Sequence, residues 1–256
     1  MSKLLVHSGA ADSEGCVLRV TPESAGWRYV GFEVYRAGSI ERRTDDRETC
    51  VVVLSGQADL AAGEEEWPGV GGRASVFDGP PTALYVPPGV AWSAQGDDFA
   101  VCTAPAATGA DTRLLPPSGA RHEDRGAGAE AREIFHILME DQPAESLLVT
   151  EVRTPAAHWS SFPPHKHDVD DPPRETLLEE TYYHRLRPDG GFGFQRVYTE
   201  DRTLNEAFAV GHGDVVLVPC GYHPVAAGPR HDLYYLNVMA GRVRAWHIAT
   251  DPAFSS

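Results

Sequence analysis

The sequence predicts an all-β protein made of two β-barrels in one chain. Its 256 residues are enough for two barrels of ordinary size. The 25 glycines and 20 prolines indicate many turns and short elements. Segments such as GWRYVGFEVY, ESLLVTEVRT and DLYYLNVM are short, rich in β-branched and aromatic residues, and bounded by turn signals. This pattern is typical of strands in a sandwich or barrel.

A faint internal repeat between residues 26–105 and 158–240 indicates two similar halves. In each half an acidic residue opens an apolar strand, Glu48 in ETCVVVLSG and Glu180 in ETYYHRL. In each half a later strand ends in proline and glycine, LYVPPG in the first and LVPCG in the second. Glu48 and Glu180 are therefore predicted to be counterparts.

The boundary between the halves is expected within residues 104–135. This stretch is rich in Pro, Gly, Ala and mixed charges and lacks a periodic apolar pattern, as expected of a connector. We therefore predict an N-terminal barrel over 1–118 and a C-terminal barrel over 119–256.

Composition excludes some partners. The formal net charge of −15 disfavours nucleic acid and anionic membrane surfaces, because both are bound mainly through Lys and Arg. It does not exclude a small anionic substrate, since a few focused residues set the field of a site. The sequence has no signal-peptide core and no membrane-length apolar run, so a cytoplasmic protein is expected. Four scattered cysteines argue against a disulfide framework.

Four residues of the C-terminal half are candidate metal ligands. His165 and His167 stand two apart in WSSFPPHKHD, so on an extended strand both imidazoles face the same side. Glu180 opens the next inward strand, and His223 follows a glycine turn after a later strand. Three imidazoles and one carboxylate suit one divalent ion per chain, such as Zn, Mn, Fe, Co or Ni. The alternative is that these are ordinary polar residues of turns and surface, because a His-x-His pair arises by chance.

The N-terminal half lacks a comparable set. IERRTD stands where a His-x-His pair is expected, and Ala91 occupies the place of His223. Glu48 alone is read as a polar rim or ion-pair residue. This barrel is therefore predicted to be structural.

Further polar residues lie on or beside the ligand-bearing segments: Lys166, Arg174, Glu175, Tyr182, His184, Arg196 and Tyr222. Strand alternation puts Tyr182 and His184 on the inward face of Glu180, although Tyr182 is equally well explained as a core aromatic. Lys166 should point away from its flanking histidines into solvent. Arg174 and Glu175 lie in a loop, where a rim or lid role competes with simple exposure.

The motifs WSSFPPHKHD, LEETYYHRLRPDGGFGFQRVYTEDRTLNE and DVVLVPCGYHPV together resemble the 5-deoxy-glucuronate isomerase family of bacterial myo-inositol breakdown. The related uronate isomerases of pectin breakdown are more distant. The resemblance covers nearly the full length and implies a bicupin, two jelly-roll barrels in one chain, with a metal held by His165, His167, Glu180 and His223 in the second barrel.

The resemblance implies conversion of 5-deoxy-glucuronate to 2-deoxy-5-keto-gluconate through a metal-stabilised enediolate. Such a step needs carbonyl polarisation and a base. Four residues are candidates for the base: Glu175, Tyr182, His184 and Tyr222. Three are candidates for binding the substrate carboxylate: Lys166, Arg174 and Arg196.

Two other functions stay open. One is a metal-dependent cupin dioxygenase, which would use a similar ligand set with iron. The other is a non-catalytic sugar-binding cupin, although no helix-turn-helix segment for DNA binding is evident. Exposed strand edges favour a homo-oligomer in either case.

Overall fold

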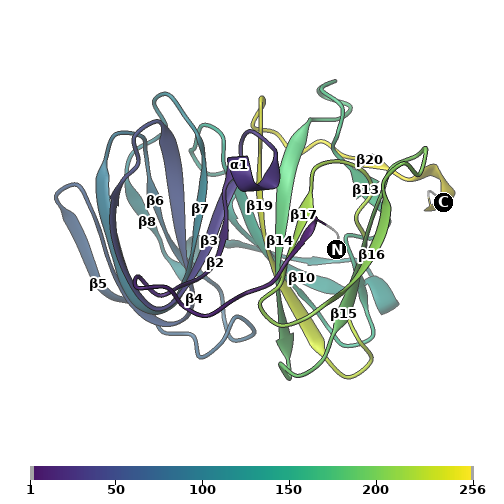
Figure 1. Cartoon of the computed structure of the whole chain (residues 1–256), viewed down its shortest axis with the longest axis horizontal. Helices are drawn as coiled ribbons and strands as arrows, with labels where there is room; N and C mark the ends of the chain where they lie inside the picture. Colours follow the sequence, from purple (N-terminus) through teal and green to yellow (C-terminus); the bar gives the residue numbers. More distant parts are fainter. Residues whose placement is uncertain (1–2, 255–256) are drawn as a thin grey trace. The chain divides into compact units, whose positions relative to one another are not determined.

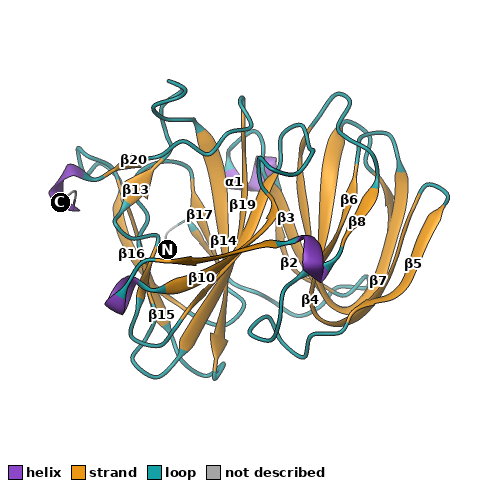
Figure 2. Ribbon diagram, turned by 180° about the vertical axis from the view of Figure 1, so that it is seen from behind, coloured by secondary structure: helices purple, strands orange, loops and turns teal. Residues whose placement is uncertain are grey.

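The computed structural model describes residues 3–254, and these residues are nearly all β-structure (Figure 1). The one α-helix among them, α1 (Pro22–Ala25), has four residues, and Figure 2 shows strands and loops making up almost all of the ribbon. The all-β prediction is confirmed. Within residues 3–254 no helix has the length and hydropathy needed to cross a membrane.

The chain forms two compact units. The N-terminal unit consists of Ser8–Arg121 and Phe135–Thr150. The C-terminal unit consists of the described residues within 1–7, 122–134 and 151–256. The predicted barrel ranges, 1–118 and 119–256, remain a prediction, and the compact units differ from them in two longer segments and at residues 119–121.

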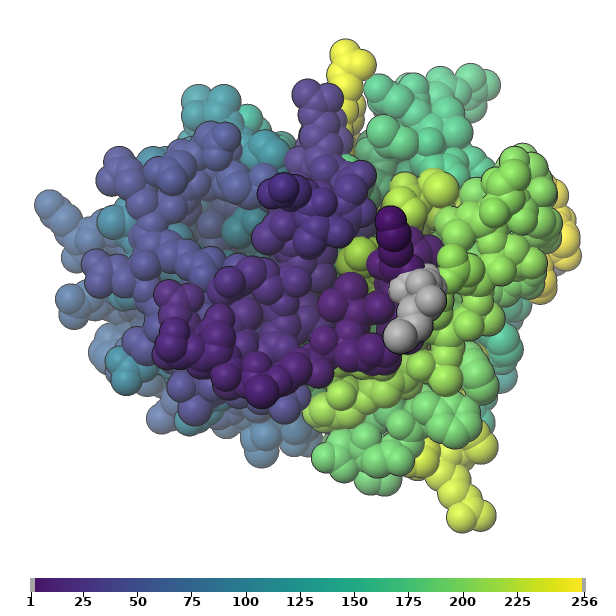
Figure 3. Space-filling view, in the orientation of Figure 1, coloured from purple at the N-terminus to yellow at the C-terminus, as the bar shows by residue number. Residues whose placement is uncertain are grey.

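Both differences have a local cause. The first described residues join the C-terminal unit because β1 (Leu5–Val6) pairs antiparallel with β17 (Val215–Val218). In Figure 3 the first residues of the chain (dark purple) accordingly lie against later residues (green). Residues 135–150 join the N-terminal unit because the main chain at Ser146 and Leu147 donates to the Glu48 carboxylate, at 2.6 and 2.5 Å.

The N-terminal unit is built on a sheet with strand order β2-β3-β7-β4-β6-β8, and β5 pairs with β4. Its elements are β2 (Cys16–Val20), β3 (Gly31–Arg43), β4 (Arg47–Ala62), β5 (Glu65–Gly71), β6 (Thr82–Val86), β7 (Ala91–Pro105), β8 (Arg113–Leu115) and a 3-10 turn, Pro117–Gly119.

Strand β4 forms because its first half, ETCVVVLSG, is a run of β-branched and small apolar residues buried on both faces. Val51 and Val53 pack into the core cluster of the unit, with Tyr35 and Phe99 stacked at 5.0 Å between ring centroids. Gly56 interrupts the ladder with φ of 68°, and a Cβ there would meet the Asp97 side chain at 2.2 Å. Only glycine is compatible with this bulge.

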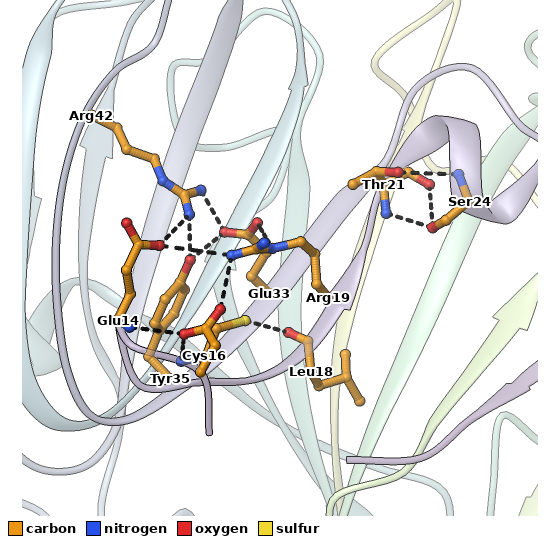
Figure 4. A network of polar contacts seen from close by, with 10 residues as sticks. Glu14, Cys16, Leu18, Arg19, Thr21, Ser24, Glu33, Tyr35 and Arg42 are labelled. Atoms are coloured by element: carbon orange, nitrogen blue, oxygen red, sulfur yellow. Dashed lines mark hydrogen bonds and ion pairs between the residues drawn. The ribbon is translucent and has the colours of Figure 1, made fainter. Parts of the chain in front are cut away.

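A polar network lies at one end of this core (Figure 4). The Glu33 carboxylate accepts from Tyr35 at 2.7 Å and from Arg42 at 2.6 Å, and its other oxygen lies 2.8 Å from Arg19. Every polar end in this group has a partner. These charges therefore compensate one another within the N-terminal unit.

The C-terminal unit contains two main sheets. One has the order β1-β17-β14-β19-β11-β10-β9, the other β12-β18-β15-β16, and β13 pairs with β20. In the first sheet, residues 135–138 of β10 and 148–150 of β11 are counted with the N-terminal unit. The remaining strands are β9 (Arg121–Arg125), β10 (Arg132–Leu138), β11 (Leu148–Thr154), β12 (Trp159–Ser160), β13 (His165–Lys166), β14 (Leu178–Arg187), β15 (Gly193–Tyr198), β16 (Asn205–Val210), β18 (Val225–Ala226), β19 (Asp232–Gly241) and β20 (Ala249–Thr250). Two 3-10 turns, Gly128–Glu130 and Pro252–Phe254, complete it.

The predicted connector is not structureless. Residues 104–135 include β8, β9 and the first part of β10. Strand β9, with the sequence RHEDR, escaped prediction because it is an edge strand with mostly exposed polar side chains. Hydrophobic alternation, the main strand signal in a sequence, is absent from such an edge.

Candidate metal centre

Three of the predicted ligands meet in the interior of the C-terminal unit. Glu180 Oε2 lies 2.9 Å from His167 Nε2 and 3.3 Å from His223 Nε2. The three residues are 3, 2 and 0% exposed, respectively. Their ligand atoms all lie within 4.8 Å of one another, the spacing of side chains that could share one cation.

Local structure explains how each side chain arrives there. Glu180 is on β14, the strand that pairs with both β17 and β19, and its neighbour across the sheet is Val218. His223 follows Gly221, whose φ of 87° and close approach to the Tyr198 carbonyl, 2.6 Å from a hypothetical Cβ, admit no side chain. The predicted glycine turn therefore exists and delivers His223.

The fourth predicted ligand lies beside this group. His165 is 8% exposed, and its ring packs edge-on against that of His223 with centroids 4.9 Å apart. The negative charge of Glu180 also acts to raise the pKa of this imidazole, although burial outweighs it. His165 thus adjoins the centre, while the tightest contacts join the other three residues.

The second ring nitrogen of each histidine faces a main-chain carbonyl. The pairs are His167 Nδ1 with Leu178 O at 3.1 Å, His223 Nδ1 with Gly221 O at 2.8 Å, and His165 Nδ1 with Pro163 O at 3.3 Å. A carbonyl oxygen only accepts, so Nδ1 is the donor in each pair. Metal-ligating histidines are commonly oriented in this way, with Nε2 left for the ion.

In this tautomer the imidazole lone pairs and the carboxylate repel one another, and a cation would remove the repulsion. With hydrogen on Nδ1, the neutral rings of His167 and His223 present Nε2 lone pairs to the Glu180 carboxylate. Within the described residues His223 Nε2 is buried and makes no hydrogen bond. A divalent ion among these atoms would satisfy all three groups, so the donor set fits a metal.

The pKa shifts reflect burial and this close contact. Burial lowers the pKa of His165 well below its usual value. Burial is the largest effect on His167 and opposes its charge. The hydrogen bond and the charge of Glu180, together with main-chain hydrogen bonds, nevertheless raise the His167 pKa, because a proton on Nε2 relieves the same repulsion that a cation would. For Glu180, burial acts to raise the pKa, while the two histidines dominate and lower it to about 2. The centre therefore holds a carboxylate rather than a carboxylic acid.

A cluster of hydroxyl groups borders the centre, and sequence reasoning missed most of it. Tyr182 OH lies 2.9 Å from Ser161 Oγ, and Tyr235 OH contacts both Ser160 and Ser161. The Tyr182 ring lies 5.5 Å from that of His223. The sequence did contain indications of this cluster: the two serines precede the His-x-His pair, and Tyr235 occupies an inward position of β19. Neither pattern is specific for a cluster of hydroxyl groups.

Tyr182 and His184 lie on the inward face of β14 as predicted. Their rings are stacked, with centroids 6.1 Å apart, and both residues follow Glu180 along the strand. His184 is fully buried and its Nε2 lies 2.8 Å from Gln195, while burial lowers its pKa to about 4. Burial raises the pKa of Tyr182 well above its usual value. At neutral pH both side chains are therefore uncharged.

Lys166 and Glu175 form an ion pair with each other. Lys166 Nζ lies 3.0 Å from both Glu175 oxygens and 2.7 Å from Asp168, and Lys166 is only 8% exposed. The expectation that Lys166 is solvated is therefore wrong, because two carboxylates offset the desolvation of its ammonium group. Glu175 also accepts the main-chain N–H groups of Asp168 and Val169, so it organises this loop.

The other predicted side chains have partners of their own. Arg174 has an 82% exposed side chain and pairs with Asp171. The exposed Arg196 donates to Asn205 at 2.7 Å, and Tyr222 donates to Glu200 at 3.0 Å. None of these three contacts involves a member of the His167–Glu180–His223 group.

The repeat alignment was off by one residue. In β4, Thr49 pairs with Val86, just as Glu180 pairs with Val218 in β14. Thr49 is therefore the structural counterpart of Glu180, and Glu48 faces the other side of the strand. Glu48 is not a rim residue, because it is fully buried and accepts from Tyr85 and three main-chain N–H groups.

Among the described residues a second group, His122, Asp124 and Glu133, also has ligand atoms within 4.8 Å of one another. His122 and Asp124 are exposed, and Arg153 lies 3.8 Å from Glu133. A neighbouring guanidinium competes with any cation there, so the buried group is the stronger candidate.

Comparison with known proteins identifies a family for this chain. Residues 4–256 match the sequence profile of the KduI/IolB family. The chain belongs to that family. A 5-deoxy-glucuronate isomerase from Geobacillus thermodenitrificans is 50% identical over 98% of this chain and 94% of that protein. The Bacillus subtilis protein of the same name is 41% identical over 93% of this chain and 90% of its own. These relatives establish this member of the family as an isomerase.

Solved structures show the same fold. An IolB-like protein from Salmonella typhimurium superposes with a TM-score of 0.94 at 42% identity, covering 98% of both chains. A Bacillus subtilis oxalate decarboxylase mutant superposes with a TM-score of 0.63 at 12% identity, covering 98% of this chain and 80% of the other. The second likeness shows a cupin-like fold alone.

Proposed function

We propose that this chain is a bicupin 5-deoxy-glucuronate isomerase that forms 2-deoxy-5-keto-gluconate in myo-inositol catabolism. The observation that supports it most is the buried group of His167, Glu180 and His223, with imidazole Nε2 atoms directed at one carboxylate oxygen. Full-length relatives at 41 and 50% identity bear the same isomerase name. One metal ion per chain would bind these three residues together with His165.

The metal, when bound, would polarise the substrate carbonyl and stabilise the charge of the enediolate. The protein supplies orientation and exclusion of water. Main-chain carbonyls hold the three rings in one tautomer, and the burial of Glu180 removes bulk solvent from its oxygens.

Proton transfer between adjacent substrate carbons needs a group beside the centre. Of the four predicted candidates, Tyr182 combines a ring against His223 with a hydroxyl in the serine–tyrosine cluster. His184 lies behind it, and the polar ends of Glu175 and Tyr222 are held by Lys166 and Glu200. Because burial raises its pKa and keeps the hydroxyl protonated, we assign Tyr182 to donating a proton to a substrate oxygen, and the base that removes the carbon-bound proton stays open among the other three candidates.

The test follows substrate protons by NMR in deuterated water. Purified wild-type protein should convert 5-deoxy-glucuronate and exchange hydrogen at the reacting carbons. His223→Ala should lose bound metal and at least about 100-fold in activity, because a ligand and its charge environment disappear together. His231→Ala, which alters a half-buried histidine outside the group, is the matched control and should retain both.

Two results would overturn the proposal. Unchanged substrate spectra with metal-loaded wild-type protein would remove the isomerase activity. Full metal content in His223→Ala would remove the ligand assignment. Oxygen consumption in step with loss of the sugar acid would instead indicate a dioxygenase.

A further inference from the structure

Arg132 is a buried cation for which the described residues offer no carboxylate partner. It is 8% exposed, and within residues 3–254 its guanidinium donates to two main-chain carbonyls, Glu130 O at 2.8 Å and Phe162 O at 3.1 Å. Exposed arginines of the same unit do pair with acids, as Arg174 does with Asp171 and Arg187 with Asp232. Buried charges are normally compensated, so an unpaired guanidinium indicates a site for an anion.

Strand geometry directs Arg132 toward the interior. It stands two residues before Ile134 on β10, and Ile134 belongs to the core cluster of the C-terminal unit. Alternate residues of a strand share a face, so Arg132 occupies the inward face near the start of β10. There it lies in the same unit as the candidate metal centre.

One hydrogen bond connects Arg132 to the segment that carries the hydroxyl cluster. Its bond to Phe162 O reaches the residue that follows Ser160 and Ser161, both of which contact Tyr235. Burial raises the pKa of Tyr235, and the positive charge of Arg132 opposes that effect. Tyr182, which shares Ser161, then leads to His223.

We propose that Arg132 binds the carboxylate of the sugar acid and selects acids over neutral sugars. This inference rests on the proposed function, in which a six-carbon chain carries an aldehyde at one end and a carboxylate at the other. With the aldehyde at the metal ligands, the carboxylate needs a separate cation in the same interior. Two of the five guanidinium N–H groups have main-chain partners, so donors remain for a carboxylate.

The three cations predicted from sequence are less suited to binding the substrate carboxylate. Lys166 is already paired with Asp168 and Glu175, and Arg174 and Arg196 are exposed. Using Lys166 for the substrate would mean breaking a buried ion pair. Arg132 can receive a carboxylate without losing one, which is why the structure favours it.

The experiment compares two substrates in four proteins. The substrates are 5-deoxy-glucuronate and the neutral sugar in which a hydroxymethyl group replaces the carboxylate. The proteins are wild type, Arg132→Gln, Arg132→Lys and the control Arg230→Gln, which changes an exposed arginine. Metal content and circular dichroism establish that each variant is loaded and folded.

Arg132→Gln should lower kcat/KM for the acid about 10- to 100-fold, the usual loss for a hydrogen bond to a charged group. It should leave kcat/KM for the neutral sugar unchanged. Arg132→Lys should recover part of the loss, because an ammonium keeps the charge but not the planar fork. Equal losses for both substrates would show that Arg132 only supports the fold, and no loss for the acid would also overturn the inference.

A binding measurement separates this inference from the proposed function. Gluconate, a six-carbon sugar acid without an aldehyde, is titrated into the metal-loaded proteins by calorimetry. Weaker binding to Arg132→Gln, with normal binding to Arg230→Gln, supports the anion site even if wild-type protein fails to isomerise the substrate. Equal binding to all four proteins, alongside normal isomerisation, would reject Arg132 and leave the proposed function intact.

Discussion

Asp168 connects the loop after β13 to the main chain that holds His223. Its Oδ2 accepts the Gly221 N–H at 2.9 Å, and the Gly221 carbonyl lies 2.8 Å from His223 Nδ1. Its other oxygen accepts from Lys166 at 2.7 Å. Asp168 therefore acts as a positioning residue, since it holds the N–H of Gly221, the residue whose carbonyl orients the His223 imidazole.

We predict that Asp168→Asn weakens metal binding about 10-fold, at the low end for loss of a group that orients a ligand. The amide can still accept from Gly221, but it loses the charge that pairs with Lys166. The measurement is a competition titration with a metal-binding dye. Asp170→Asn, at an exposed residue near Arg242, is the control. Equal affinities in both variants would show that His223 is held without Asp168.

At the scale of elements, strand β14 contributes three residues in or beside the candidate metal centre. Glu180, Tyr182 and His184 alternate along it, so the period of the strand alone places them on one face. This is why sequence reasoning placed Tyr182 and His184 correctly. Arg132 was missed because it lies on a strand that the sequence presents as a polar connector.

The Glu145 carboxylate holds a loop of the N-terminal unit, residues 107–109, in place. Glu145 accepts the main-chain N–H groups of Ala107, Thr108 and Gly109, each at 2.8 Å. These bonds, led by that from Gly109, lower the pKa of Glu145 to about 2 from an ordinary value of 4.5. The carboxylate thus ties the loop before β11 to the loop after β7 within the N-terminal unit.

This predicts a pH dependence of stability. Because the folded pKa is the lower one, the stabilisation is complete above pH 4.5 and is lost as the pH falls toward 2. The difference in Tm between wild type and Glu145→Gln should therefore shrink between these values. Thermal unfolding followed by circular dichroism measures it, and Glu64→Gln in an exposed turn is the control. A difference in Tm that stays constant down to pH 2 would contradict the prediction.

At the scale of the whole molecule, both candidate metal groups among the described residues consist of residues in the C-terminal unit. The N-terminal unit has an apolar core and a closed polar network instead. The position that Glu180 occupies in β14 is taken by Thr49 in β4. A bound ion should therefore stabilise one unit and leave the other unaffected.

We predict that chelation changes hydrogen exchange in the C-terminal unit alone. Peptides covering β14 and β17 should exchange faster after the metal is removed, because ligand binding no longer opposes their opening. Peptides covering β4 and β7 should be unchanged. Mass spectrometry of metal-loaded and chelated protein provides the comparison. Equal acceleration in both sets would mean that the ion stabilises the whole chain.

The sequence by itself determined the all-β class and the four candidate ligands. Both depend on local rules: strand composition, alternation of side chains, and a glycine that turns the chain before His223. The family resemblance added a candidate substrate. These inferences need no knowledge of which strands are neighbours.

Only the tertiary structure decided the rest. It buried Lys166 in an ion pair and showed that Thr49 rather than Glu48 is the counterpart of Glu180 in the repeat. It also buried Arg132 in the C-terminal unit with no carboxylate partner among the residues that the structure describes. Each outcome depends on contacts between residues far apart in the chain or on the pairing register of a strand. Burial and charge compensation are properties of those contacts, and a linear pattern does not encode them.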